Sequence, residues 1–278
     1  MQAHSSDSVY YVPPPSIWPL VGSVALLTLA TGFVLLINKI AAGPYIMTLG
    51  VGILLVMLFG WFGAVIKESL AGKYSQQVDL SFRWGMVWFI FSEVMFFAGF
   101  FGALYYARSF AVPWLADTQL LWPGFSAAWP TAGPGLNTVI SPVNAWGIPA
   151  INTLILLTSG ATVTWAHWGL QKDNQFQLKL GLALTVLLGV IFIGMQIHEY
   201  GEAAFTIRDG IYGATFYMLT GFHGFHVIMG TVMLIVILLR SMAGHFSPSH
   251  HFAFEAVAWY WHFVDVVWLL LFIFIYWL

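Results

Sequence analysis

The stretch from Phe252 to Leu278 constrains this chain most. It is apolar and long enough to cross a bilayer, for which about 20 helical residues suffice, yet it contains Glu255, His262 and Asp265. On a helix, Glu255 and His262 share one face, and Asp265 lies about 60° from His262. Ionisable groups at such a depth are costly unless they face protein or water. The stretch must therefore pack against other helices with its polar edge turned inward.

Composition extends this conclusion to the whole chain. Of the 278 residues, 60% are hydrophobic and only 7% are charged, which is typical of a polytopic membrane protein and not of a soluble domain. The absence of cysteine excludes disulfides, thiolate metal sites and cysteine nucleophiles. A net charge of −2 gives no sign of nucleic-acid binding. No Lys or Arg precedes the first apolar run, so we expect neither a signal peptide nor a transit peptide.

Apolar segments of membrane-spanning length recur along the chain and predict an all-α protein with seven transmembrane helices. The expected helices are Ile17–Asn38, Pro44–Ile66, Trp84–Ala107, Ile148–Leu170, Phe176–Tyr200, Ile211–Arg240 and Phe252–Leu278. We expect a single membrane domain over 1–278, in which a polar cytoplasmic linker, 67–83, separates helices one and two (17–66) from helices three to seven (84–278). The long loop 109–147 is rich in tryptophan, so we expect it at the membrane interface.

The positive-inside rule sets the predicted orientation. With the N-terminus inside, six basic residues fall on inner loops and helix ends: Lys67, Lys73, Arg83, Lys172, Lys179 and Arg240. Three fall on the outer side: Lys39, Arg108 and Arg208. This excess favours a cytoplasmic N-terminus.

Glu93 is the first candidate functional residue. It lies about ten residues inside the third predicted helix, roughly 15 Å deep, with no basic residue on neighbouring turns. Burial in lipid disfavours a charged carboxyl, so we expect Glu93 to be protonated at neutral pH. Two roles fit this position: a proton-linked or lipid-facing carboxylate, or a protonated acid that hydrogen-bonds another helix for packing.

Three histidines accompany the buried carboxyls Glu93 and Asp265. His223 and His226 are i, i+3 neighbours on the sixth predicted helix, and His262 lies on the seventh. They could bind haem or a metal. Spacing alone is weak support for a ligand set, so we expect buried, neutral histidines that satisfy carboxyl or backbone groups, with no metal, no cofactor and no catalytic residue on this chain.

Polar residues also gather at the helix ends. His198, Glu199 and Glu202 end the fifth predicted helix and are expected to form a solvated cluster at the outer surface. His167 is expected to reach the headgroups from the inner end of the fourth. Basic residues at the inner ends of helices two and six suit an anionic phospholipid headgroup, although ordinary positive-inside charge explains them equally well. The expected lipid-binding residues are Arg240, Lys67, Glu68, Trp61 and His245.

Several sequence words together resemble subunit III of the haem–copper oxidases. They are PSIWPL at 15–20, SEVMFF at 92–97, INTLILLTSG at 151–160, TWAH at 164–167, DGIYGATF at 209–216, TGFHGFHVIMG at 220–230 and HHFAFEAVAWYWHFVDVVW at 250–268. They keep the family's order and extend over nearly the whole chain. The last two are long and highly specific.

The resemblance implies a non-catalytic subunit of a proton-pumping oxidase that reduces oxygen to water. Helices one and two would face helices three to seven in a V around a lipid-filled cleft. Haems and copper would lie in subunits I and II, with subunit I as the main contact and a respiratory supercomplex as a further assembly. Glu93 falls on the family's carbodiimide-reactive carboxylate, and Arg240 on an arginine that binds a phospholipid headgroup. The chain would stabilise subunit I and support its proton uptake.

Two other interpretations stay open at this stage. One is subunit III of a quinol oxidase, although seven predicted helices favour the cytochrome c type. The other is a proton or small-solute carrier that uses Glu93, His223, His226 and Asp265, although neither internal repeats nor broken helices are evident. We expect the chain in the plasma membrane of a bacterium in preference to the mitochondrial inner membrane.

Overall fold

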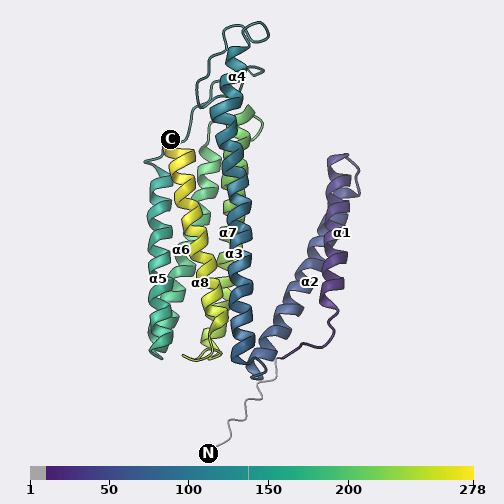
Figure 1. Ribbon diagram of the computed structural model, residues 1–278, viewed down its shortest axis with the longest axis vertical. Coiled ribbons are helices and arrows are strands. Elements are labelled where there is room, and N and C mark those ends of the chain that lie inside the picture. The colour runs from purple at the N-terminus through teal and green to yellow at the C-terminus, as the bar shows by residue number, and fades with distance from the viewer. Residues whose placement is uncertain (1–10, 137) are drawn as a thin grey trace, which may run out of the picture. The chain divides into compact units, whose positions relative to one another are not determined.

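The computed structural model describes residues 11–136 and 138–278, and these residues form helices and loops without a β-strand (Figure 1). The α-helices are α1 (Trp18–Ile37), α2 (Gly43–Leu70), α3 (Gln76–Tyr106), α4 (Val112–Asp117), α5 (Ile148–Gln171), α6 (Gln175–Glu202), α7 (Gly210–Met242) and α8 (Phe252–Leu271). Two π-helical segments, η1 (Ala107–Ala111) and η2 (Phe272–Trp277), extend α3 and α8. Within these described residues, seven spans are long and apolar enough to cross a membrane, which confirms the predicted all-α membrane architecture.

The third span is longer than the sequence suggested. It was expected to end at Ala107, but α3, η1 and α4 form one continuous helical span of 42 residues, Gln76–Asp117. Pro113, which has no N–H to donate, lies in the first turn of α4. The π-helical turn before it changes the hydrogen-bond spacing at that point, so the helix continues past the proline.

The polar segment 67–83, which was expected to be a linker, is mostly helical. α2 runs to Leu70 and α3 begins at Gln76, which leaves residues 71–75 as the connection. Ser75 caps α3, since its hydroxyl accepts a hydrogen bond from the Val78 backbone N–H at 3.4 Å. Glutamine and arginine are good helix formers, so polar residues can extend a helix here.

The chain divides into two compact units, residues 1–82 and 83–278. In the first, α1 and α2 form an antiparallel hairpin whose helices approach closely at glycines. A Cβ on Gly32 would lie 2.4 Å from the Met47 backbone nitrogen, and one on Gly50 would lie 2.8 Å from that of Leu29. Small residues allow membrane helices to pack at such short range. The hairpin therefore depends on backbone-to-backbone contact.

The second unit packs around Trp261 of α8, which is fully buried. A Cβ on Gly189 of α6 or Gly230 of α7 would come within 3.0 and 2.8 Å of its ring, so both glycines make room for it. Its indole N–H donates to the Ser159 hydroxyl of α5 at 2.9 Å. Trp268, about two turns further along α8, donates its indole N–H to the Thr153 hydroxyl of α5 at 2.9 Å. α8 is thus fixed among α5, α6 and α7.

The loop before α5 folds back onto the start of α7. The backbone N–H groups of Ile211 and Tyr212 donate to the carbonyls of Ala132 and Thr131, at 3.4 and 3.2 Å. The ring of Trp129 packs edge-on against Tyr212, with 5.6 Å between centroids. This part of the loop is therefore an ordered cover on the helix end.

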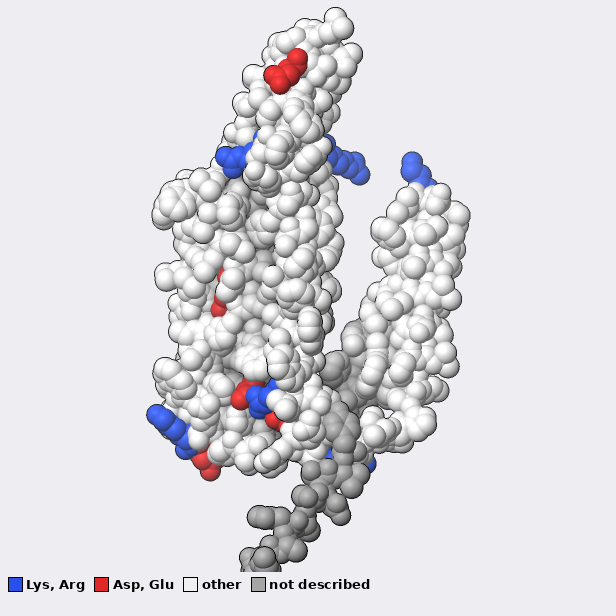
Figure 2. Space-filling model, in the orientation of Figure 1, with Lys and Arg blue, Asp and Glu red and all other residues white. Residues whose placement is uncertain are grey.

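Charged residues follow the expected membrane pattern. On the face drawn in Figure 2, Lys, Arg, Asp and Glu lie mainly toward the ends of the helices, and the surface between those ends is almost entirely uncharged. That band is the part a bilayer would cover.

Gly32→Ala should destabilise the first unit. The added methyl group meets the α2 backbone, which cannot move aside as a flexible side chain would, and overpacking of this kind costs about 1–3 kcal/mol. We expect a lower midpoint of thermal unfolding in the purified, assembled protein. Gly52→Ala is the matched control, because a Cβ at Gly52 meets nothing within 4 Å. Equal midpoints for the two variants would contradict the close approach.

Candidate functional site

Glu93 of α3 contacts His226 of α7 inside the second unit. The carboxyl Oε2 lies 3.0 Å from the imidazole Nε2. The other ring nitrogen, Nδ1, lies 2.6 Å from the backbone carbonyl of Phe222, one turn earlier in α7. The two side chains are 22% and 10% exposed, so the contact is largely shielded. It joins two helices that are 133 residues apart in the chain.

The contact has a defined proton count. A carbonyl oxygen can only accept, so His226 Nδ1 carries a hydrogen that it donates to Phe222. Nε2 then needs a second hydrogen between itself and the Glu93 oxygen. That proton belongs either to a neutral carboxylic acid that donates to a neutral imidazole or to an imidazolium that donates to a carboxylate. Glu93 and His226 therefore share one proton.

Aromatic rings surround this pair. Phe97 packs edge-on against the His226 imidazole, with centroids 5.0 Å apart, and Tyr260 stacks on it at 6.3 Å. Phe96 and Phe263 complete the contact at 6.0 and 6.3 Å. Such surroundings exclude water and strengthen the polar contact that they enclose.

His223 lies one turn before His226 but in different surroundings. It is 1% exposed and packs against the rings of Trp268 and Phe192, with centroids 5.3 and 6.0 Å away. Neither of its ring nitrogens has a hydrogen-bond partner. The prediction that it satisfies a carboxyl or backbone group is wrong, because its helix face points into the aromatic core.

Asp265 and His262 form a weaker pair on α8. Asp265 is buried, with its Oδ2 3.7 Å from His262 Nδ1, and a Cβ on Gly160 of α5 would lie 2.5 Å from that Oδ2. His262, expected to be buried, is instead 47% exposed at its side chain. It lines a shallow groove with Thr164, whose hydroxyl lies 3.3 Å from its Nε2. Asp265 therefore lies on the buried side of this face of α8, and His262 lies at its exposed edge.

These three histidines do not form a ligand set. His226 is engaged with Glu93, His223 packs among rings, and His262 lies at the groove. In the parts of the chain that the structure describes, one group of three His or carboxyl side chains has its ligand atoms within 4.8 Å of one another, and it contains none of the three.

Among the expected lipid-binding residues, Arg240 ends α7. Its guanidinium lies over the ring of Phe246, 4.6 Å from the centroid, and its Nε is buried without a hydrogen-bond partner. The backbone N–H of His245 donates to the Arg240 carbonyl at 3.0 Å, while its own Nδ1 is buried and unpartnered. Two buried donors or acceptors without partners thus lie near one helix end.

The other three belong to the first unit. Glu68 of α2 accepts hydrogen bonds from Tyr11 at 3.2 Å and from Tyr74 at 2.8 Å. These bonds attach two segments to α2: the residues before α1 and the connection between α2 and α3. Burial, followed by the contact with Glu68, raises the pKa of Tyr74. Trp61 is 42% exposed on α2, and Lys67 lies in its last turn.

The expected solvated cluster at the end of α6 is only partly correct. His198 and Glu202 are exposed and lie 3.4 Å apart, but Glu199 is 2% exposed. It accepts hydrogen bonds from the Tyr276 hydroxyl at 2.6 Å and the Gln196 amide at 3.1 Å. His198 and Glu199 are adjacent in the sequence but lie on different faces of α6. The partner of Glu199, Tyr276 on η2, could not be identified from the local sequence.

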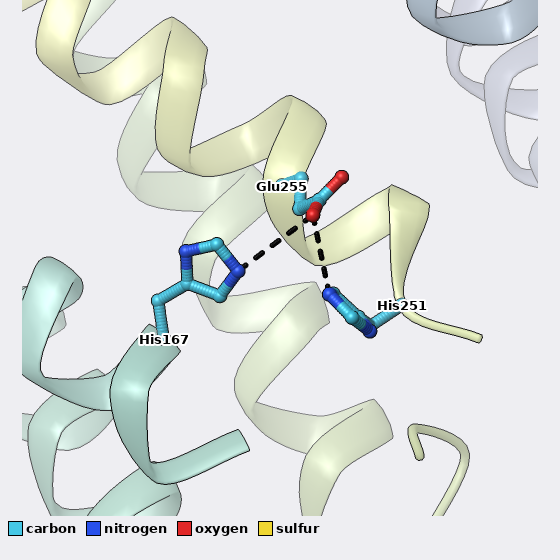
Figure 3. Close-up of side chains that lie close together, drawn as sticks. All are labelled: His167, His251 and Glu255. Carbon is cyan, nitrogen blue, oxygen red and sulfur yellow. Dashed lines mark ion pairs between the residues drawn. The ribbon is translucent and has the colours of Figure 1, made fainter. Parts of the chain in front are cut away.

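A second polar cluster lies where α5 ends and α8 begins, beside the N-terminal part of α3. Glu255 of α8 forms an ion pair with Arg83 of α3 through Oε2. Its other oxygen, Oε1, lies 3.2 Å from Nε2 of His251 and 3.7 Å from Nε2 of His167 on α5 (Figure 3). This is the group of three identified above. The sequence carried one signal for it, the i, i+4 spacing of His251 and Glu255, but the other members come from distant segments.

Comparison with known proteins agrees with the motifs noted in the sequence. Residues 8–278 match the family model described as cytochrome c oxidase subunit III. The chain belongs to the cytochrome c oxidase subunit III family. A cytochrome c oxidase subunit 3 from Marchantia polymorpha is 47% identical, over 98% of this chain and 97% of its own length. Proteins of the same name from Petromyzon marinus and Papio hamadryas are 44% and 45% identical, with 96–99% of each chain covered.

Membership decides between the interpretations that the sequence left open. Subunit III of cytochrome c oxidase is a non-catalytic part of a respiratory oxidase complex, and this multi-span membrane chain is of that kind. The relatives are named for cytochrome c oxidase, so a quinol oxidase is not favoured. A solute carrier is not favoured either.

Proposed function

We propose that this chain stabilises the catalytic subunit of cytochrome c oxidase, supports proton uptake into it and holds structural phospholipid. The family match over residues 8–278 carries the proposal. The contact between Glu93 and His226 supports it, since a shared proton inside a helix bundle suits a proton-linked support role better than a redox role.

Subunit I is the main partner in this proposal, with subunit II and a respiratory supercomplex as further contacts. Large aromatic side chains on α3 remain exposed, among them Trp84 at 59% and Trp88 at 65%. Lipid or a neighbouring subunit must cover such a surface. Haems and copper are assigned to the partner subunits in this proposal, in agreement with the family match. The expected membrane is the plasma membrane of a bacterium.

Glu93 is not placed on the obligatory proton route. Its proton is shared with His226 and enclosed by rings, and no other ionisable residue of the described chain forms an ion pair with either side chain. A group held in this way stabilises the α3–α7 contact. It also presents a protonated acid to apolar reagents when the proton lies on the carboxyl.

Glu93→Gln should abolish labelling by an apolar carbodiimide, which reacts with the protonated acid, and should leave oxygen reduction within about twofold of wild type. Glutamine keeps the shape and can donate to His226. Glu93→Ala should do more harm, since it opens a cavity and strands His226, at a cost of about 1–3 kcal/mol. That harm should appear as looser subunit association and faster loss of activity over repeated turnovers of the reconstituted complex.

Glu202→Gln is the matched control, since Glu202 is exposed at the end of α6 and its loss should change neither quantity. The proposal fails if Glu93→Gln stops electron transfer at once while the complex remains assembled. A direct proton-transfer role for this chain would then take its place.

Lipid binding is proposed at the end of α7. A buried donor such as Arg240 Nε is costly when it lacks a partner. The phosphate of an anionic phospholipid supplies an acceptor with matching charge, and the exposed apolar side chains of the same helix, such as Leu239, suit its acyl chains. His245 lies beside Arg240 and would contact the same headgroup.

Arg240→Ala should reduce the phospholipid that stays with the purified complex. A charge-assisted contact to phosphate contributes about 1.5–3 kcal/mol, so retention should weaken roughly 10- to 100-fold. Mass spectrometry of lipid extracted after detergent purification measures this. Arg208→Ala, in the loop before α7, is the control. Unchanged lipid in Arg240→Ala would count against the assignment.

A further inference from the structure

We propose that His167, His251 and Glu255 bind a divalent cation of the zinc class where α5 ends and α8 begins. The three side chains converge on one point from two segments more than 80 residues apart. Figure 3 shows both imidazole rings directed at the Glu255 carboxyl group. The site is separate from the contact between Glu93 and His226.

The spacing of the ligand atoms suits a tetrahedral ion. Glu255 Oε1 lies 3.2 Å from His251 Nε2 and 3.7 Å from His167 Nε2, and all three atoms lie within 4.8 Å of one another. Bonds of about 2.0–2.1 Å in tetrahedral geometry require ligand atoms about 3.3 Å apart. Small side-chain rotations therefore close the site. Two imidazoles and one carboxylate leave a fourth position for water.

The orientation of His251 suits a metal ligand. Its Nδ1 lies 3.1 Å from the Ser247 carbonyl, which can only accept, so the hydrogen is on Nδ1. Its Nε2 then faces Glu255 Oε1 at 3.2 Å, so either a proton or a metal cation must lie between the two atoms. A backbone carbonyl that orients the far ring nitrogen is also the usual support of a metal-binding histidine.

His167 also presents its Nε2 to the carboxyl group, at 3.7 Å from Oε1. The amide nitrogen of Gln171 lies 3.3 Å from this atom and can only donate, so Nε2 carries a lone pair. Gln171 is on the exposed surface of α5 and can move away when an ion takes the lone pair. Both histidines thus direct Nε2 at the same carboxylate oxygen, Oε1 of Glu255.

Arg83 occupies the second oxygen of Glu255 and leaves the first one available. Its guanidinium pairs with Oε2 and lies over the Phe252 ring, 5.4 Å from the centroid. Held in this way, the carboxyl group points Oε1 at the two imidazoles. Ligand carboxylates are commonly oriented by hydrogen bonds of this kind. The side chains of His167, His251 and Glu255 are 23%, 11% and 13% exposed, so an ion can enter from the surface.

A bound ion would staple α5 to α8 at the end where Trp261 and Trp268 do not reach. It would hold the end of α5 at a fixed distance from the start of α8, because His167 lies on α5 while His251 and Glu255 lie at the first turn of α8. Loss of the ion should loosen this end without removing a redox group.

Equilibrium dialysis of the purified oxidase complex against radioactive Zn²⁺ tests the proposal. Wild type should bind one more Zn²⁺ per complex than His167→Ala and His251→Ala. His250→Ala is the matched control: it lies next to His251, but its Nδ1 contacts Ser249 at 2.9 Å and it is not in the cluster. It should bind as many Zn²⁺ ions as wild type. Haem content verifies that each variant assembles.

Crystals of the wild-type complex grown with Zn²⁺ give a second test that needs no variant. Data collected above and below the zinc absorption edge should show an anomalous peak among the three side chains. Equal zinc numbers in all four proteins would overturn the proposal. An empty difference map would also overturn it, and would mean that a proton, not a metal ion, lies between His251 and Glu255.

Discussion

The second unit depends on a hydrogen bond between Glu93 and His226. An ionisable group at mid-membrane depth must find a partner, and here the partner lies on another helix. The bond fixes α3 against α7, and the hydrogen that His226 donates to the Phe222 carbonyl fixes the ring itself. The geometry that satisfies the carboxyl therefore also positions two helices.

The same constraint explains the other polar contacts. Glu199 of α6 is buried and accepts a hydrogen bond from Tyr276 of η2, so the C-terminal ends of α6 and η2 are held together. Glu255 of α8 pairs with Arg83 of α3. Trp261 is apolar except for one N–H, and that N–H donates to α5. Each contact joins different helices, so a few polar atoms specify which helices are neighbours while apolar contact fills the space between them.

Much of this architecture could be predicted from the sequence. Seven apolar segments indicated seven spans, because length and hydropathy are local properties. The resemblance of the segment 250–268 to one family indicated the oxidase subunit, and the family match confirms it. The depth of Glu93 followed from its position in the third segment.

What could not be predicted depends on which helices are neighbours. The partner of Glu93 is 133 residues away, and single-sequence reasoning has no access to that distance. His262 was expected inside because it follows the helix face of Glu255, but α5 contacts it without covering it, and its side chain stays 47% exposed. The extent of the third span was missed at both ends. The polar residues before Trp84 were assigned to a linker, and the residues around Pro113 were assigned to a loop, but both stretches are helical.

A double-mutant cycle on Glu93 and His226 tests the central claim most directly. The midpoint of thermal unfolding of this chain in the purified oxidase would be compared among wild type, Glu93→Gln, His226→Gln and the double variant. If the shared hydrogen bond holds α3 to α7, the two single effects should not add, with a coupling free energy of about 1 kcal/mol or more. Effects that add within about 0.3 kcal/mol would show that the two side chains act independently, and would contradict the account.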